Sequence, residues 1–376
     1  MRSEVHPLRV LLKAIFLFAV INVVFALLSP AVGKITLYNY MVPGRLRFPY
    51  EKEPSFYSMG HNAPVYEDFD AMFGAHIISE RKPADEFRLI LLGDSATWGV
   101  SVSADDTLSE QINRLHIQTC DGRNVRAYNL GYPMSFLARD ILILDKALEY
   151  KPDMVFWLIT LSALQPKTAE TYFIIPHSER YLRLANTYGL RLSYLSQPVQ
   201  EPSFWDRTII GQRIRLKNII TTQAFGVLWA ATRIDNHESL QPESGRPNSN
   251  VDDNVDYEGR YPDGTLNFFD SLMMDVLSTA FDVAGDIPVV LVNEPIFVAD
   301  GKNHLVRYNE LYPRWVYDEY RQFMLEWAEE HDHQLLDYWD TLPPEDFADQ
   351  YFHRRSSGER RLAESLAFEI KKLVCP

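Results

Sequence analysis

The sequence predicts an α/β protein, a three-layer α/β/α sandwich in which helices cover both faces of a parallel sheet of about five strands. Short apolar runs alternate along the chain with segments of helical periodicity, and this alternation is typical of a parallel sheet. The runs are apolar almost throughout, as expected of strands that are buried on both faces. A longer apolar stretch near the amino terminus predicts one transmembrane helix ahead of this domain.

The amino-terminal stretch predicts a cytoplasmic stub and a membrane anchor within residues 1–33. Residues 14–29 carry no charged side chain, and residues 8–12 extend the apolar run towards the length that crosses a bilayer. Basic residues stand before the apolar centre, which favours an amino terminus in the cytoplasm. They are Arg2, Arg9 and Lys13. The alternative is a cleaved signal peptide with small residues at Ala31 and Gly33 near the cleavage site. Under either interpretation the rest of the chain lies outside the cytoplasm.

Two regions follow the anchor. Residues 34–84 are irregular and rich in Pro, Gly and Tyr, so we expect a linker that becomes a collar on the domain. Residues 85–376 contain the alternating pattern, which is interrupted at about 165–275 by an expected insertion, either a lid or a binding wall over the sheet edge. The predicted strands are 87–93, 124–131, 152–161, 287–295 and 334–339. The predicted helices are 105–115, 139–150, 315–331 and 358–374.

Polar or glycine-containing segments end four of the predicted strands. Because the carboxyl ends of parallel strands meet at one edge of a sheet, we expect these segments to lie together and to form a ligand site. The segments are Gly93–Asp94–Ser95, Asn129–Leu130–Gly131, Thr160–Leu161–Ser162 and Asn293–Glu294.

Ser95 is the predicted nucleophile. It follows the first strand in the stretch LILLGDSATWGV, residues 89–100, and stands at the start of a short helix. Glycine at position 93 permits a tight turn, and the unpaired N–H groups at a helix start can hold an oxyanion. A serine hydroxyl needs a base to attack a carbonyl, usually a histidine that a carboxylate orients.

His353 is the predicted base. It lies in the loop between the fifth strand and the last helix, and in a doubly wound sheet this loop returns to the same edge as Ser95. Asp349 precedes it by four residues, so a local turn can bring its carboxylate onto the imidazole. Asp346 is the alternative carboxylate.

These motifs resemble those of the SGNH hydrolases, also called the GDSL esterase and lipase family, in a membrane-anchored bacterial form. The resemblance rests on GDSATWG at 93–99, on NLGYP at 129–133 and on the closing Asp349–His353 pair before a last helix. It covers about residues 85–376 in order and spacing. It implies a flavodoxin-like three-layer fold and an esterase, lipase, carbohydrate deacetylase or O-acyltransferase activity, without a cofactor or a metal.

The resemblance also assigns roles to individual residues. Ser95 would be the nucleophile and, through its own N–H, an oxyanion donor, and the N–H of Gly131 would be the second donor. His353 would act as base and then as acid towards the leaving alcohol, and Asp349 would orient it.

The chain departs from the family pattern at two places. The family's third block is usually Gly-x-Asn-Asp, and here Ser162 stands at the asparagine position, with Thr160 and Asn293 as alternative third donors. The closing pair is commonly spaced Asp-x-x-His, and here it has one extra residue, which is why Asp346 stays open beside Asp349.

Composition narrows the expected partners. A formal net charge of −14 argues against nucleic acid, because phosphate binding needs a basic face. Two cysteines, Cys120 and Cys375, are too few for a cysteine-rich zinc site. They form one disulfide or stay two separate buried thiols, and both possibilities stay open here. The sequence carries no prediction of an oligomeric state.

The sequence therefore predicts a single-pass, membrane-anchored serine esterase with its catalytic domain outside the cytoplasm. The expected partners are the membrane and an acyl ester or acylated glycan, with cell-surface polysaccharide as the expected substrate class. One alternative is acyl transfer to a sugar hydroxyl by the same fold. Another is a non-catalytic glycan-binding or assembly protein, which the absent third-block asparagine motivates.

Overall fold

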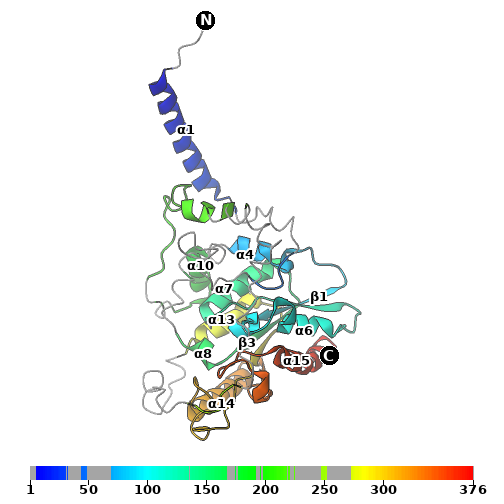
Figure 1. Cartoon of the computed structure of the whole chain (residues 1–376). Coiled ribbons are helices and arrows are strands. Elements are labelled where there is room, and N and C mark those ends of the chain that lie inside the picture. The colour runs from blue at the N-terminus through cyan, green and yellow to red at the C-terminus, as the bar shows by residue number, and fades with distance from the viewer. Residues whose placement is uncertain are drawn as a thin grey trace.

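Five strands form one parallel sheet in the order β2-β1-β3-β4-β5. The strands are β1 Glu86–Leu92, β2 Asn124–Asn129, β3 Met154–Ile159, β4 Val289–Asn293 and β5 Gln334–Asp337. The predicted α/β fold with five parallel strands is confirmed by this computed structural model (Figure 1). The structure describes residues 6–30, 32, 44–48, 69–134, 136–166, 174, 177–191, 195, 198–217, 219–220, 224, 247–251 and 272–375.

Helices connect the strands and cover the sheet. The longer helices are α1 Pro7–Leu28, α7 Leu137–Ala147, α10 Ser178–Tyr188, α13 Met274–Ala284, α14 Arg314–Glu330 and α15 Ser356–Val374. The shorter ones are α4 Phe69–Ala75, α5 Ser95–Trp98, α6 Leu108–Arg114 and α8 Leu161–Leu164. Single 3-10 turns occupy Ile77–Ser79, Ala104–Asp106, Leu148–Tyr150 and Pro344–Asp346.

The sheet is the middle of three layers, because its two faces bury different helices. Successive side chains of a strand point to opposite faces. On β1, Ile90 and Leu92 belong to a core that includes residues of α7, α13 and α14. Leu89 and Leu91 belong to a second core, which includes residues of α6 and α15. All seven residues of β1 are buried, which explains why its sequence is an apolar run rather than an alternation.

The sequence did not predict α13. This helix begins at Met274, where the predicted insertion ends and the core resumes. Within the insertion the structure describes α10 and residues 198–217 among others, and the rest of it lies outside the described residues. Most of the predicted linker at 34–84 lies outside them as well.

α1 is long and apolar enough to cross a membrane, with 22 residues from Pro7 to Leu28. It extends away from the sheet domain as the dark blue helix of Figure 1. Among its residues only Asn22 and Ala26 are buried. The domain therefore leaves almost the whole apolar surface of this helix uncovered.

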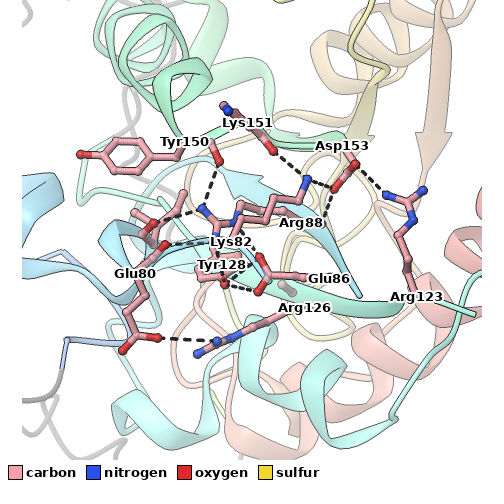
Figure 2. A network of polar contacts seen from close by, with 12 residues as sticks. Glu80, Lys82, Glu86, Arg88, Arg123, Arg126, Tyr128, Tyr150, Lys151 and Asp153 are labelled. Atoms are coloured by element: carbon pink, nitrogen blue, oxygen red, sulfur yellow. Dashed lines mark hydrogen bonds and ion pairs between the residues drawn. The ribbon is translucent and has the colours of Figure 1, made fainter. Parts of the chain in front are cut away.

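A buried polar network ties together the amino ends of β1, β2 and β3, the edge opposite to Ser95 (Figure 2). The Arg88 guanidinium, 1% exposed, donates to the Glu86 carboxylate at 2.6 Å, and the Tyr128 hydroxyl donates to the same carboxylate at 3.0 Å. Asp153 accepts from the backbone N–H of Arg88 and from Arg123. Buried charges of this kind stay in place because they are paired and hydrogen-bonded.

Cys120 and Cys375 form a disulfide, which decides between the two possibilities that the sequence left open. Their Cα atoms are 5.2 Å apart, and 255 positions of sequence separate them. The bond joins the end of α15 to the turn that leads into β2. It thereby links the last helix covalently to the half of the sheet that carries Ser95.

We expect the disulfide to contribute strongly to stability, because it closes a long loop in the unfolded chain. The Cys120→Ser/Cys375→Ser double variant should lose about 2–5 kcal/mol of unfolding free energy. Urea unfolding of the full chain in detergent, with and without reductant, measures this loss. Reductant should lower the midpoint of the wild-type protein and leave that of the double variant unchanged. A wild-type midpoint that does not respond to complete reduction would contradict the expectation.

Candidate active site

Ser95 stands at a sharp turn between β1 and the short helix α5. The Asp94 carboxylate caps this helix by accepting from the N–H of Ala96 at 2.8 Å. Gly93 has a φ of +156°, and a Cβ atom built on it would lie 2.4 Å from Thr97 Oγ1 and 2.9 Å from the Leu158 carbonyl. A side chain at this position would push α5 off the sheet edge. Glycine therefore lets the half-buried Ser95 sit directly beyond the end of the strand.

Residues 44–48 pack against the other side of this turn. The Arg47 guanidinium donates to the carbonyls of Gly99 and Val102 at 2.8 and 3.1 Å, and it stacks on the ring of Trp98. The indole N–H of Trp98 donates to the Phe48 carbonyl at 2.8 Å. Trp98 is thus part of the packing behind the serine, and its ring is buried.

His353 meets Ser95 at the carboxyl edge of the sheet. Ser95 Oγ lies 2.7 Å from His353 Nε2. On the other side of the ring, Nδ1 lies within hydrogen-bond distance of Asp349 Oδ2. With Nδ1 protonated, the imidazole donates to Asp349 and accepts from the serine hydroxyl through Nε2. The structure therefore brings Ser95, His353 and Asp349 together.

The extra residue between Asp349 and His353 is absorbed by a turn. Asp349 Oδ1 accepts from the backbone N–H groups of Tyr351 and His353, at 2.9 and 3.3 Å, so the carboxylate also fixes the loop. Asp346, the alternative carboxylate, has other partners. It accepts from Ser357 Oγ at 2.6 Å and pairs with Arg361 at the start of α15. The alternative with Asp346 beside the imidazole is therefore wrong in this structure.

This arrangement has the geometry that activates a serine hydroxyl. An imidazole within hydrogen-bond reach can take the proton as the oxygen attacks a carbonyl, and a carboxylate on the far nitrogen stabilises the resulting imidazolium. Ser95 itself is only partly buried. No His, Cys, Asp and Glu group of three or more in the described part of the chain could hold a metal ion.

The predicted oxyanion donors Ser95 and Gly131 differ in whether their backbone N–H groups already have an acceptor. Ser95 begins α5, and no acceptor among the described residues takes its backbone N–H, as is usual for the first residue of a helix. The N–H of Gly131 donates to Asn129 Oδ1 at 3.0 Å, so it is engaged within the loop. Gly131 also packs tightly on α5: a Cβ atom built on it would lie 2.6 Å from the backbone nitrogen of Trp98.

The structure contradicts the prediction that Asn293 is an oxyanion donor. Asn293 is 2% exposed, and both ends of its carboxamide have partners on β5 and α14. Nδ2 donates to Asp337 at 2.7 Å, and Oδ1 accepts from the hydroxyls of Tyr317 and Tyr320 at 3.0 and 3.4 Å. This carboxamide holds β4, β5 and α14 together and is not placed to donate to an oxyanion.

The segment after β3 is held by one tyrosine. The Tyr312 hydroxyl donates to Thr160 Oγ1 at 2.9 Å, and the backbone N–H of Ser162 lies 3.3 Å from the same hydroxyl oxygen. Thr160 is fully buried, which removes it as a donor to a ligand, whereas Ser162 is partly exposed. Of the three candidates for the third donor, Ser162 therefore fits the edge best.

Sequence reasoning missed a buried charge cluster directly behind the histidine. Arg354, the neighbour of His353, donates to Glu294 at 2.8 Å and to Glu359 at 3.2 Å, and the three side chains are at most 1% exposed. Burial and the charge of Asp94 raise the pKa of Glu294 to about 8, and burial raises the pKa of Glu359 to about 7. Arg354 joins the end of β4 to α15 and so fixes the loop that presents the imidazole. The sequence signals were Glu294 at a polar strand end and an arginine directly after the predicted base.

The loop after β2 is held by a second buried arginine. Arg139 donates to the carbonyls of Pro133 and Met134 at 2.7 and 2.6 Å and pairs with Asp140. Met134 has a φ of +74°, which is uncommon for a residue with a side chain, and it is 54% exposed. Uncommon backbone conformations of this kind concentrate at functional sites.

The chain has few matches among known proteins. Neither the known protein families nor the curated proteins contain a match to the sequence. Among solved structures, one similar chain is described provisionally as a lipolytic protein of the G-D-S-L family from Desulfitobacterium hafniense. It is 11% identical, the match covers 75% of this chain and 98% of that one, and the TM-score is 0.31. A likeness this distant carries no functional conclusion.

The packing around Gly93 predicts a large cost for any side chain there. We expect Gly93→Ala to lower the unfolding free energy by about 3 kcal/mol or more, through backbone strain and overpacking together. Gly122→Ala is the matched control, because Gly122 has a φ of +84° but no atom within 4 Å of a built Cβ. It should cost about 1 kcal/mol from backbone strain alone. Equal losses in the two variants, measured by urea unfolding, would exclude the steric argument.

The buried carboxylates predict a fall in stability as the pH rises. Between about 4.5 and 8 the folded protein keeps a proton on Glu294 that the unfolded chain has lost, so the unfolding free energy decreases through this range. Glu294→Gln should make the decrease in melting temperature between pH 5 and pH 8 smaller. Glu364→Gln, an exposed carboxylate on α15, is the control and should keep the wild-type slope. An unchanged slope in Glu294→Gln would refute the assignment.

Proposed function

We propose that the chain is a serine esterase of SGNH type, with Ser95 as nucleophile, His353 as general base and Asp349 as the carboxylate that orients it. One observation carries the proposal, the contact of Ser95 Oγ with His353 Nε2 at 2.7 Å while Asp349 holds Nδ1. The Ser95 hydroxyl attacks the carbonyl carbon of an ester and passes its proton to Nε2. The imidazolium then protonates the leaving alcohol, and water releases the acid from the acyl-enzyme by the same steps.

The developing oxyanion needs donors at the serine turn. The backbone N–H of Ser95 is the first, and the hydroxyl of the partly exposed Ser162 is the candidate side-chain donor at the same edge. Gly131 can contribute only if its N–H leaves the Asn129 carboxamide when an acyl group binds. Loss of one oxyanion donor costs about 3 kcal/mol, or roughly a hundredfold in rate, so we expect a slow esterase.

We propose further that α1 anchors the enzyme in a membrane, with the domain outside the cytoplasm. The length and apolar surface of α1 support the anchor, and basic residues ahead of its centre support the orientation. The disulfide supports it too, because such bonds persist in oxidising compartments. An exported, membrane-held esterase would meet acyl esters on cell-surface polysaccharide, which we propose as the substrate class.

Acyl transfer is a second candidate, and the insertion between β3 and β4 favours it. Gln350, next to Asp349, donates to the carbonyls of Asn248 and Asn250 of the insertion, and an element at this edge would keep water from the acyl-enzyme. Glycan acceptors separate the two activities. Added acceptor should divert acyl groups from water in a transferase and should leave the yield of free acid unchanged in an esterase.

A non-catalytic role on the same scaffold is the rival class. The observation that favours it is the occupied state of Gly131 and Asn293, two of the predicted oxyanion donors. A fluorophosphonate probe tests it, because the probe reacts with an activated serine whatever the natural substrate. Probe mass on Ser95, mapped by mass spectrometry, supports catalysis, and an unlabelled Ser95 supports the rival.

The esterase proposal predicts a specific pattern in variants. Ser95→Ala should abolish release of p-nitrophenol from a short-chain acyl ester, and Asp349→Asn should lower kcat by roughly 10⁴-fold, because the imidazole loses its orienting carboxylate. Ser103→Ala, a nearby exposed serine, is the control and should keep wild-type activity. Undiminished turnover in Ser95→Ala would end the proposed mechanism.

A further inference from the structure

Residues 204–220 of the insertion expose an unusual number of large apolar side chains. Five of them are between 42% and 75% exposed. They are Phe204, Trp205, Ile210, Ile214 and Ile220. Large apolar surface grouped in this way on one segment marks a site of contact with a partner or a membrane.

This segment lies beside α1. The backbone N–H of Ile210 donates to Asn22 Oδ1 at 3.2 Å, and Asn22 Nδ2 donates to the Phe18 carbonyl at 2.9 Å within α1. Asn22 is 6% exposed and Ala26 is 5% exposed. The segment thus covers the one polar side chain in the middle of the apolar helix. In Figure 1 it is the green helical stretch at the foot of α1.

The contact fixes the depth of the segment relative to α1. Asn22 stands six residues before Leu28, the last residue of the helix, which is about 9 Å along the axis. Leu27 and Leu28 are more than 70% exposed, so the apolar surface of α1 continues past the level of Ile210. If α1 crosses a bilayer, the segment lies level with lipid rather than with bulk water.

The charge of the segment complements an anionic lipid surface. Residues 204–220 contain four basic side chains and one acidic one, within a chain whose net charge is −14. The basic residues are Arg207, Arg213, Arg215 and Lys217. Arg207 and Arg215 also line a cavity of about 700 Å³ between the segment and the domain, whose lining mixes basic side chains such as Lys146 and Arg180 with the acidic Asp70, Glu179, Glu201 and Asp206. The segment therefore combines exposed apolar side chains with an excess of basic ones, as in helices that lie in a membrane interface.

We propose that residues 204–217 and 219–220 form a second membrane contact, an interfacial segment that lies in the headgroup region of an anionic lipid surface beside α1. The inference rests on the proposed anchoring and adds to it a fixed orientation of the domain. A single helix leaves the domain free to turn about the helix axis. A second contact with the same leaflet removes that freedom and holds the domain in one orientation towards the membrane.

The experiment uses the full chain in vesicles of phosphatidylcholine and phosphatidylglycerol that contain doxyl-labelled lipid. The native cysteines are joined to each other, so a single introduced cysteine can carry a fluorescent NBD group. Ile214→Cys reports on the segment and Leu17→Cys on α1. Phe368→Cys is the matched control, because Phe368 is equally apolar and 69% exposed but lies on α15.

We expect doxyl lipid to quench at least half of the fluorescence at position 214 and to leave that at position 368 unchanged. Quenching at position 17 without quenching at position 214 overturns the interfacial segment and supports the anchor. A protein partner that covers the segment would give this result. Quenching at 214 but not at 17 supports the segment and overturns the anchor. Quenching at neither position overturns both.

Discussion

Parallel pairing of the strands is the constraint on which the rest of the molecule depends. Because all five strands run in one direction, every carboxyl end leaves the sheet at the same edge. Ser95 follows β1 and His353 follows β5, so residues 258 positions apart in sequence come within hydrogen-bond distance. No local element could achieve this. The site exists only when the whole sheet has formed, which couples its geometry to the global stability of the domain.

Two buried features fix the reacting groups at this edge. On the serine side, the absence of a side chain at Gly93 lets α5 approach β3 closely. On the histidine side, Arg354 clamps Glu294 and Glu359 together in a place that water does not reach. Burial keeps a proton on Glu294 at neutral pH, so the guanidinium faces one neutral carboxyl group and one that titrates near pH 7. Such a cluster costs desolvation free energy, and the cost is consistent with a role in positioning rather than in stability.

Much of the fold could be predicted from the sequence, because a strand buried on both faces has to be apolar at every position. The serine and histidine could be placed because their positions after β1 and β5 follow from topology alone. The direction of the Asn293 side chain could not be predicted, because it depends on the face of β4 that the residue occupies and on the tyrosines of α14. The partners of Arg354 are long-range contacts without a local pattern. The helix α13 was missed because it directly follows the irregular insertion.

The disulfide has a consequence for a chain that is cut by a protease. A cut inside the insertion would divide the molecule into one fragment with Ser95 and another with His353. Cys120 belongs to the first fragment and Cys375 to the second, so the sulfur–sulfur bond would keep both halves in one covalent molecule. The domain can therefore lose the continuity of its backbone in the insertion without releasing the fragment that carries Ser95 or the fragment that carries His353.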